Sequence, residues 1–331
     1  MTQGRRRRDA PLDGRAGAAV GSAAETEAGE AMIGEGAAAA VVLVLSLGIA
    51  GCARPPEAEV ARGTGTAGAD TLRLASWPAQ GRTRAAILAL HGFGDAGELT
   101  YQGAAAYWAA RGIAVYAPDQ RGFGANPSRK DWPGVETLVA DAKLLAAEVR
   151  SRHPGVPLAV VGHSMGGGVA LAAAAEGMEA DALVLAGPAI AGGDQLPGVA
   201  RAGAWALAAA LPDRRWTGKN LDLRPSDNYP AMVRVASDPR HFADPSSREI
   251  WGLVQVMDAA AAAAPRVEIP VLTLMGARDM YLRPDRVRAI HERAPGAAGF
   301  REYPEGWHWL FRDLQREAVW RDVAEFALDL E

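Results

Sequence analysis

The chain has 331 residues, of which 49% are apolar and 22% are charged, a composition that supports a packed core and excludes a wholly disordered protein. Its formal net charge is −4, and it contains one cysteine and six histidines. We therefore expect no nucleic-acid partner, no intramolecular disulfide and no cysteine-based metal site.

The first seventy residues lack the pattern of a fold. Residues 1–35 are rich in Gly, Ala, Arg and Glu without apolar periodicity, and we interpret them as disordered. The apolar run 37–50 (AAAAVVLVLSLGIA) is short for a spanning helix and suits the apolar part of a secretion signal. We expect residues 1–51 to form an N-terminal extension with a signal or anchor segment. Residues 52–70 read as a flexible tether, so the folded part should begin near Thr71.

The only cysteine lies at the end of the apolar run, in Ile49-Ala50-Gly51-Cys52. This sequence resembles the lipobox of bacterial lipoproteins, in which the signal is cleaved before the cysteine and lipid is added to its sulfur. The resemblance implies lipid attachment at Cys52. An uncleaved helical anchor is the alternative. Either interpretation predicts an exported, membrane-anchored protein, in a bacterial periplasm or cell envelope.

Strands and helices alternate after residue 71. Apolar runs predict strands at 71–75, 86–90, 112–117, 158–161, 182–186, 271–275 and 300–303. Alanine-rich runs predict helices at 98–110, 135–152 and 167–176. Continuous apolar strands separated by helices are typical of a mostly parallel sheet covered by helices on both faces. In such sheets ligands bind beyond the carboxyl ends of the strands.

The alternation stops between residues 189 and 265. This segment carries Trp205, Trp216 and Trp251, and apolar side chains recur at helical spacing from Ile250 through Leu253 and Val254 to Met257. We interpret it as a helical cap inserted over the carboxyl edge of the sheet, with ordinary core helices as the alternative. The predicted core is 71–188 together with 266–331, and the predicted cap is 189–265.

A first glycine motif runs from Gly92 to Gly97 and satisfies G-x-G-x-x-G after a strand. Asp119 ends the next strand, 22 positions after Gly97, as the acidic residue of a dinucleotide site would. His91 directly before the first glycine argues against that site, because a small residue is usual there. A dinucleotide-dependent oxidoreductase is nevertheless kept as a rival interpretation.

A second motif, Gly162-His163-Ser164-Met165-Gly166, matches G-x-S-x-G between an apolar strand and an alanine-rich helix. A nucleophilic serine needs this context, because a sharp strand-to-helix turn projects its oxygen from the top of the sheet. The helix N-terminus then stabilises negative charge on the substrate. The motif predicts that Ser164 is a nucleophile.

A nucleophilic serine needs a histidine base and an orienting acid from later loops. Asp279 follows the strand 271–275 and His308 follows the run 300–303, which gives the chain order Ser164, Asp279, His308 of α/β-hydrolases. Asp258 and Asp285 are alternative acids, although neither directly follows a strand.

The other histidines fit the role of base less well. His91 is expected to support the loop that binds the oxyanion, and His163 adjoins the serine but should point elsewhere. His153 ends a helix and His241 lies in the insertion, whereas His291 lies within a helix and is expected to be solvated.

Residues from about 71 to 328 resemble the serine α/β-hydrolases of the monoacylglycerol lipase and lysophospholipase family. The motifs that carry the resemblance are His91-Gly92-Phe93-Gly94-Asp95, Asp119-Gln120-Arg121-Gly122-Phe123-Gly124, Gly162-His163-Ser164-Met165-Gly166, Gly276-Ala277-Arg278-Asp279 and Gly306-Trp307-His308. The resemblance implies an α/β-hydrolase fold with Ser164 as nucleophile, Asp279 as acid and His308 as base. It also implies an oxyanion hole made by the backbone N–H groups of Phe93 and Met165. The acid loop from Met280 to Pro284 departs from the family by being longer and more aromatic.

The implied activity is the hydrolysis of carboxylic esters through an acyl-enzyme, without metal or organic cofactor. The expected partners are a small lipid or ester substrate and a membrane, with no obligate protein partner. An apolar cap favours medium or long monoacyl esters, such as monoacylglycerols or lysophospholipids. The alternatives are a general short-chain carboxylesterase and a lipid-tethered binding protein without turnover.

Overall fold

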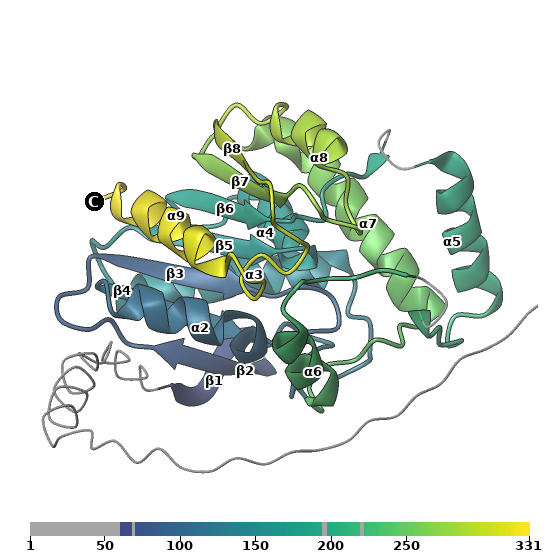
Figure 1. The fold of residues 1–331 in the computed structure, drawn as a ribbon, viewed down its shortest axis with the longest axis horizontal. Helices are drawn as coiled ribbons and strands as arrows, with labels where there is room; N and C mark the ends of the chain where they lie inside the picture. The colour runs from purple at the N-terminus through teal and green to yellow at the C-terminus, as the bar shows by residue number, and fades with distance from the viewer. Residues whose placement is uncertain (1–59, 68–69, 194–196, 219–221) are drawn as a thin grey trace, which may run out of the picture. The chain divides into compact units, whose positions relative to one another are not determined.

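The structure, a computed structural model, describes residues 60–67, 70–193, 197–218 and 222–331 (Figure 1). The strands are β1 (Ala61–Ala67), β2 (Asp70–Trp77), β3 (Ala85–Leu90), β4 (Ile113–Pro118), β5 (Leu158–His163), β6 (Ala182–Ala186), β7 (Val271–Gly276) and β8 (Ala297–Tyr303). The helices are α2 (Gly97–Ala109), α3 (Val135–Arg152), α4 (Met165–Ala175), α5 (Gly198–Ala210), α6 (Tyr229–Ser237), α7 (Ser247–Ala263), the 3₁₀ turn η3 (Ala264–Arg266), α8 (Pro284–His291) and α9 (Arg316–Leu328). Cys52 and the apolar run 37–50 lie outside these residues. Among the helices that are described, none has the length and apolar character needed to cross a bilayer.

The described strands form one sheet of eight, in the order β1-β2-β4-β3-β5-β6-β7-β8. β1 and β2 are antiparallel to their neighbours, whereas the pairs from β4 to β8 are all parallel. The central strands β3, β5, β6 and β7 are buried along their whole length. Their continuous apolar sequences follow from this, because a parallel strand covered on both faces has no solvent side. The predicted mostly parallel sheet is confirmed.

The helices cover the sheet in two layers. The side chains of α3, α4 and α8 pack with one set of strand residues, and those of α2 and α9 pack with the set on the other face. Figure 1 shows α2 and α9 in front of the sheet and α3 and α4 behind it. With the right-handed crossovers usual for parallel strands, this arrangement brings the loops after β3, β5, β7 and β8 to one edge of the sheet.

The expectation that the fold begins near Thr71 is wrong, because β1 lies within the segment interpreted as a tether. β1 pairs along its length with β2, from Ala61 opposite Ser76 to Ala67 opposite Asp70. Its sequence, ARGTGTA, has too few apolar residues to signal a strand. Backbone pairing at the sheet edge supplies the order instead.

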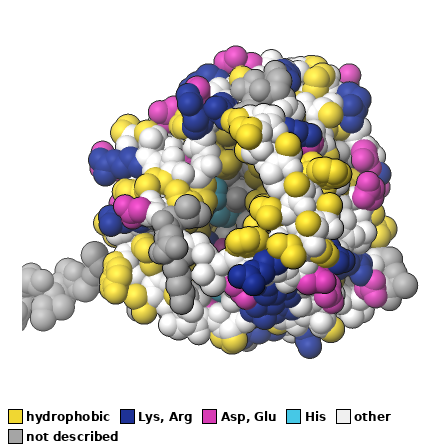
Figure 2. Space-filling model, turned by 90° about the vertical axis from the view of Figure 1, so that its right-hand side faces the viewer, with side chains coloured by type: hydrophobic (Ala, Val, Ile, Leu, Met, Phe, Trp, Pro, Cys, Tyr) yellow, Lys and Arg dark blue, Asp and Glu magenta, His cyan; other side chains and the backbone are white. Residues whose placement is uncertain are grey.

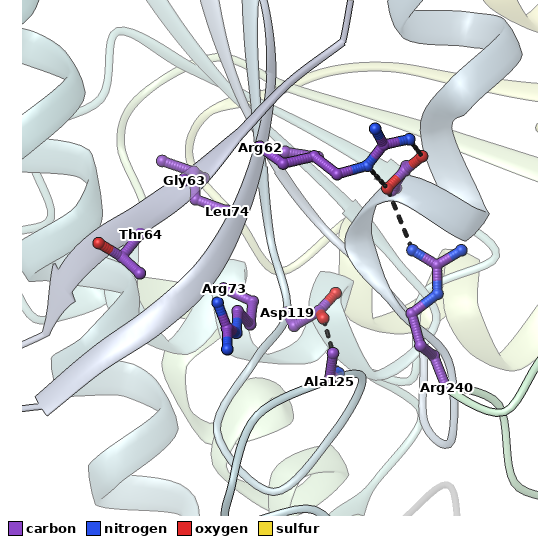
Figure 3. A pocket seen from close by; sticks show the side chains of 10 residues that line it. Arg62, Gly63, Thr64, Arg73, Leu74, Asp119, Ala125 and Arg240 are labelled. Carbon is purple, nitrogen blue, oxygen red and sulfur yellow. Dashed lines mark hydrogen bonds and ion pairs between the residues drawn. The ribbon is translucent and has the colours of Figure 1, made fainter.

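A side-chain network also ties β1 to the rest of the fold (Figure 3). Arg62 of β1 donates to both carboxylate oxygens of Glu98 on α2, at 3.0 and 2.6 Å, and Arg240 donates to the same carboxylate at 3.1 Å. These side chains, with Arg73 and Asp119, line a concavity of about 280 Å³. Its lining does not include the predicted nucleophile, acid or base.

The segment predicted as a helical cap contains α5, α6 and α7, but the boundary at residue 265 does not match the packing. α7 begins at a capping box, in which Ser246 and Glu249 bond each other's backbone N–H groups. Its second half packs against α4, with Val256 and Ala260 fully buried in the main core. The core therefore begins within α7. The apolar face expected there is also shifted, because Leu253, Val254 and Met257 are only half-buried.

Candidate active site

Ser164 lies in the one-residue turn between β5 and α4, with φ 51° and ψ −118°. Only one other non-glycine residue in the described ranges, Lys130, has a positive φ. Such a backbone conformation is strained for a side chain with a Cβ and persists only where neighbours hold it. Here the Ser164 N–H donates to the Ala186 carbonyl at 3.0 Å, and the Ser164 carbonyl accepts from Gly167 at 3.0 Å and Ala189 at 2.8 Å. The predicted strand–serine–helix context is confirmed.

Glycines around Ser164 allow this turn to pack tightly. A Cβ on Gly162 would lie 2.5 Å from the Gly166 carbonyl oxygen, and a Cβ on Gly166 would lie 2.2 Å from the Leu90 carbonyl oxygen. Both distances are far inside van der Waals contact. The two glycines of G-x-S-x-G are therefore required by the backbones that cross beside the serine.

The structure brings Ser164, His308 and Asp279 into one hydrogen-bonded chain. His308 Nε2 lies 3.1 Å from Ser164 Oγ, and His308 Nδ1 lies 2.8 Å from Asp279 Oδ2. The Asp279 side chain is completely buried and that of His308 is 8% exposed. The residues come from three separate loops, after β5, β7 and β8, and only the fold places them together.

Asp279 is held as a carboxylate. Burial alone would raise its pKa, but the His308 imidazole and two backbone donors outweigh burial, so the net pKa is lowered. The donors are the N–H groups of Tyr281 and Leu282, at 2.8 and 2.9 Å from Asp279 Oδ1. An ionised acid on Nδ1 fixes the tautomer that leaves Nε2 free to accept the serine proton.

His163 supports the loop that carries His308. Burial, and then the proximity of His308 and Arg312, lower the pKa of His163 to about 3, so its ring is neutral. Its Nε2 lies 2.9 Å from the His308 carbonyl oxygen and donates to it. The sequence indicated only that His163 points away from the substrate, and this supporting contact was missed.

Met165 follows Ser164 directly as the first residue of α4, and Phe93 lies in the loop after β3. Within the described part of the chain, neither backbone N–H group has a hydrogen-bond acceptor. The loop passes close to the serine, because a Cβ on Gly92 would lie 3.2 Å from Ser164 Cβ. Two unpaired N–H groups beside a serine, one of them at a helix N-terminus, can bind a developing oxyanion.

His91 and a buried ion pair hold the loop after β3 in place. His91 Nε2 accepts the Gln120 N–H at 2.9 Å, which agrees with the expected supporting role. Asp95 accepts from Arg312 at 2.5 Å, and both side chains are at most 5% exposed. This pair joins the loop that contains Phe93 to the segment that follows His308.

The rival dinucleotide interpretation of the first glycine motif does not fit the contacts of Asp119. One carboxylate oxygen accepts the Gly97 N–H and the other accepts the Ala125 N–H, both at 2.8 Å. A Cβ on Gly97 would lie 2.4 Å from the Ala117 carbonyl oxygen. The glycine and the acid therefore shape the turn between β3 and α2 rather than a ribose site.

The alternative acids lie elsewhere. Asp258 pairs with Arg201, and Asp285 pairs with Arg283. The expectation of a solvated His291 is wrong. Its side chain is buried on the inner face of α8, with Nδ1 3.0 Å from the hydroxyl of Thr273.

Tyr281 is a contact of the site to which sequence reasoning assigned no role. Its ring stacks on the His308 imidazole, with the ring centroids 4.8 Å apart and the planes at 27°. The sequence did contain a signal for this contact, because the loop after Asp279 is more aromatic than the family pattern.

The surface around the site is apolar. Figure 2 shows hydrophobic side chains bordering a hollow in which a histidine is visible, on the face that lies at the right of Figure 1, where α5 and α7 are found. α5 has no buried residue, and Val199 and Trp205 on it are 83% and 59% exposed. Large apolar side chains that remain exposed together on one face are typical of a surface that meets an apolar ligand.

Comparisons with known proteins agree with this geometry. The family model Hydrolase_4, described as serine aminopeptidase S33, matches residues 81–315. A monoacylglycerol lipase of Mycolicibacterium smegmatis is 30% identical over 259 residues, which cover 76% of this chain and 90% of that protein.

Solved structures show the same fold. The crystal structure of a Paleococcus ferrophilus monoacylglycerol lipase has a TM-score of 0.67 and 24% identity, covering 78% of this chain and 99% of that one. A soluble variant of the Saccharomyces cerevisiae monoglyceride lipase has a TM-score of 0.68 and 21% identity, covering 83% and 97%.

Proposed function

The chain belongs to the Hydrolase_4 family of serine aminopeptidase S33 type, and from this premise we propose that it hydrolyses carboxylic esters of monoacyl lipids through an acyl-enzyme. The observation that carries the proposal is the chain of hydrogen bonds from Ser164 through His308 to the buried carboxylate of Asp279, at 3.1 and 2.8 Å. In this proposal the three residues are nucleophile, base and orienting acid.

The reaction proceeds in two halves. Ser164 Oγ attacks the acyl carbonyl carbon while His308 Nε2 takes the serine proton, and the backbone N–H groups of Phe93 and Met165 bind the oxyanion. His308 then gives that proton to the leaving alcohol as the carbonyl–alkoxy bond breaks. A water molecule, deprotonated by His308, then attacks the acyl carbon. The bond to Ser164 Oγ breaks, the carboxylic acid leaves, and His308 returns its proton to Ser164 Oγ. Asp279 stabilises the imidazolium in both halves.

Two observations support a lipid substrate. The named relatives act on monoacylglycerols, and the face above the site exposes large apolar side chains on α5. Each methylene of an acyl chain that leaves water contributes about 0.8 kcal/mol, so a longer chain gains specificity until the apolar surface is filled. A general short-chain esterase, a tethered binding protein without turnover and a peptidase are the competing functions.

Replacement of the serine tests the reaction. Ser164→Ala should lower hydrolysis of p-nitrophenyl butyrate by about four to six orders of magnitude without changing the melting temperature. A fluorophosphonate probe should label the wild type and not the variant. Hydrolysis by Ser164→Ala at a near wild-type rate would refute the proposal, and an unlabelled, inactive wild type would favour the binding protein.

A substrate panel tests the lipid class. We expect kcat/KM to rise from acetyl to medium-chain esters, measured below the micelle-forming concentrations, and to be high for monoacylglycerols or lysophospholipids. A steady fall from acetate onward would leave a short-chain esterase. Faster cleavage of amino-acid p-nitroanilides than of esters would identify a peptidase.

We also propose that Cys52 carries a lipid that holds the enzyme at a bacterial membrane, in the periplasm or cell envelope. The support is its position at the end of the apolar run 37–50, as the only cysteine of the chain. Cys52→Ser should abolish incorporation of labelled fatty acid and release the protein from the membrane fraction. Equal membrane fractions without label on either protein would favour a helical anchor.

A further inference from the structure

Tyr281 contacts both partners of the serine. Its backbone N–H donates to Asp279 Oδ1 at 2.8 Å, and its ring stacks on the imidazole of His308. Any residue at this position could supply the backbone donor, because the amide is common to all residues but proline. The ring is the part that depends on the side chain.

Asp279, Ser164 and His163 also lie around the His308 imidazole. Asp279 contacts Nδ1 and Ser164 contacts Nε2, so both hydrogen bonds are made at the edge of the imidazole ring. The His163 ring, from the end of β5, lies 5.2 Å from that of His308 and is tilted by 47°. His163 is neutral, since burial lowers its pKa to about 3, and it brings no charge. Tyr281 is also neutral, because the hydroxyl of a tyrosine ionises only near pH 10, and burial and then Asp279 raise its pKa further.

The imidazole becomes a cation when it takes the serine proton. A cation over the face of an aromatic ring within about 6 Å is attracted by the negative face of that ring. Tyr281 satisfies this geometry at 4.8 Å, and its 27° tilt keeps the two faces close to parallel. The contact is thus stronger with the protonated imidazole than with the neutral one. An interaction that strengthens as the proton moves lowers the barrier of that step.

We propose that Tyr281 is a positioning residue, whose ring holds the His308 imidazole between Ser164 and Asp279 and stabilises the imidazolium formed during acylation. This inference rests on the proposed function and adds to it a residue that acts through the base. It assigns a role to the aromatic acid loop that departs from the family pattern.

The test compares two replacements in the full chain. Tyr281→Leu keeps apolar bulk over His308 and removes the aromatic face, whereas Tyr281→Phe keeps the face and removes only the hydroxyl group. Tyr281 is 46% exposed, which limits the strength of the contact. With p-nitrophenyl butyrate, Tyr281→Leu should lower kcat about three- to fivefold, as expected for the loss of a solvent-exposed cation–π contact, and leave KM within about twofold. Tyr281→Phe should stay within about twofold of the wild type in both constants.

The pH profile gives a readout that a structural role would not move in this direction. Loss of a contact that favours the protonated imidazole makes protonation harder. The acid limb of kcat/KM for Tyr281→Leu should therefore move to lower pH, by about half a unit. It should not move for Tyr281→Phe. A move to higher pH would mean that the ring acted only by excluding water, and would overturn the inference.

Further outcomes separate this inference from the proposed function. A Tyr281→Leu variant with wild-type kcat and acid limb overturns it, as does a change confined to KM, which would make Tyr281 a substrate contact. If Tyr281→Leu does not fold, Tyr281→Met replaces it, with Met280→Ala as a control for changes in the loop. Normal hydrolysis by Ser164→Ala, in contrast, removes the proposed function whatever Tyr281 does.

Discussion

Two helices of nearly the same composition, α4 (MGGGVALAAAA) and α5 (GVARAGAWALAAA), have opposite environments. In α4 every residue from Met165 to Ala173 is buried, whereas no residue of α5 is buried. Composition alone therefore gives two helices and does not tell which one belongs to the core. The difference comes from the neighbours, since α4 follows a central strand and α5 lies in the insertion.

The glycines of the two helices show the same contrast. A Cβ on Gly167 or Gly168 of α4 would lie 2.7 Å from Pro188 or 2.6 Å from the Ala189 carbonyl oxygen. On Gly203 of α5 it would meet no atom within 4 Å. Glycine in a helix has a conformational cost, which close packing offsets in α4 and nothing offsets in α5. The inner half of the site is thus fixed by packing, and the outer half is free to meet a ligand.

The largest effect is expected at Gly166 of α4. Gly166→Ala should lower the free energy of unfolding by more than about 3 kcal/mol, because the new Cβ would lie 2.2 Å from the Leu90 carbonyl oxygen and both backbones are buried. Urea unfolding of the purified protein measures the change. A loss below about 1 kcal/mol would mean that the turn can relax, and would weaken the comparison with α5.

A pH effect is expected at Asp313, behind the His308 loop. Its carboxylate accepts the Trp307 N–H, and burial, followed by Asp227, raises its pKa to about 7. The unfolded carboxyl group titrates near 3.8, so the stability from its neutral form is complete below that pH and is lost as pH rises to about 7. Asp313→Asn removes this titration.

The melting temperature of Asp313→Asn relative to wild type should therefore increase from pH 4 to pH 7 and then level off, by about 4–8 °C in total. Asp285→Asn, on the exposed surface of α8, serves as the control and should show no such rise. A difference independent of pH at Asp313 would place its titration outside this range.

A smaller effect is expected at Trp205 of α5, on the exposed apolar face that we propose takes the acyl chain. Trp205→Gln should lower kcat/KM for a medium-chain ester about five- to tenfold, through lost apolar contact, and leave the acetyl ester unchanged. Leu144→Gln is the matched control, because Leu144 is an exposed apolar residue on α3, outside the insertion that contains α5. Equal losses for both esters would assign Trp205 to folding rather than to the substrate.

The smallest effect is expected from Gly203→Ala on α5. Alanine fits the open space there and favours the helix, so the free energy of unfolding should rise by about 0.5–1 kcal/mol. Urea unfolding beside Gly166→Ala gives the same substitution with opposite signs in the two helices. A destabilised Gly203→Ala would show that α5 has a close neighbour.

The sequence predicted the parts of the site that depend on local patterns. Ser164 follows from the strand, motif and helix around it, and the positions of Asp279 and His308 after strands follow from the sheet. The contacts that other side chains make with these three residues were not predicted, because they depend on how distant segments pack. Tyr281 meets His308 across 27 positions, and its ring gives no periodic signal.

The errors have the same physical origin. His291 has a polar sequence context, and only the packing of α8 on β7 buries it. β1 was not predicted because its sequence has no apolar pattern. Its order comes from backbone pairing with β2 at an edge of the sheet. The exact limit of the insertion within α7 depends on contacts with α4 that the helical pattern of α7 does not reveal.

The pairing of β1 also determines how the fold would respond to mechanical force. β1 and β2 form a hairpin whose open end holds Ala61 opposite Ser76 and whose closed end holds Ala67 opposite Asp70. A pull on the chain at Val60 would enter at the open end, across ladder bonds that lie perpendicular to the strands. Such bonds break one after another, as in a zipper, with the contact between Arg62 and Glu98 among the first to be loaded. Tension from the N-terminal side would therefore peel β1 away and leave the loops that hold Ser164, Asp279 and His308 unloaded.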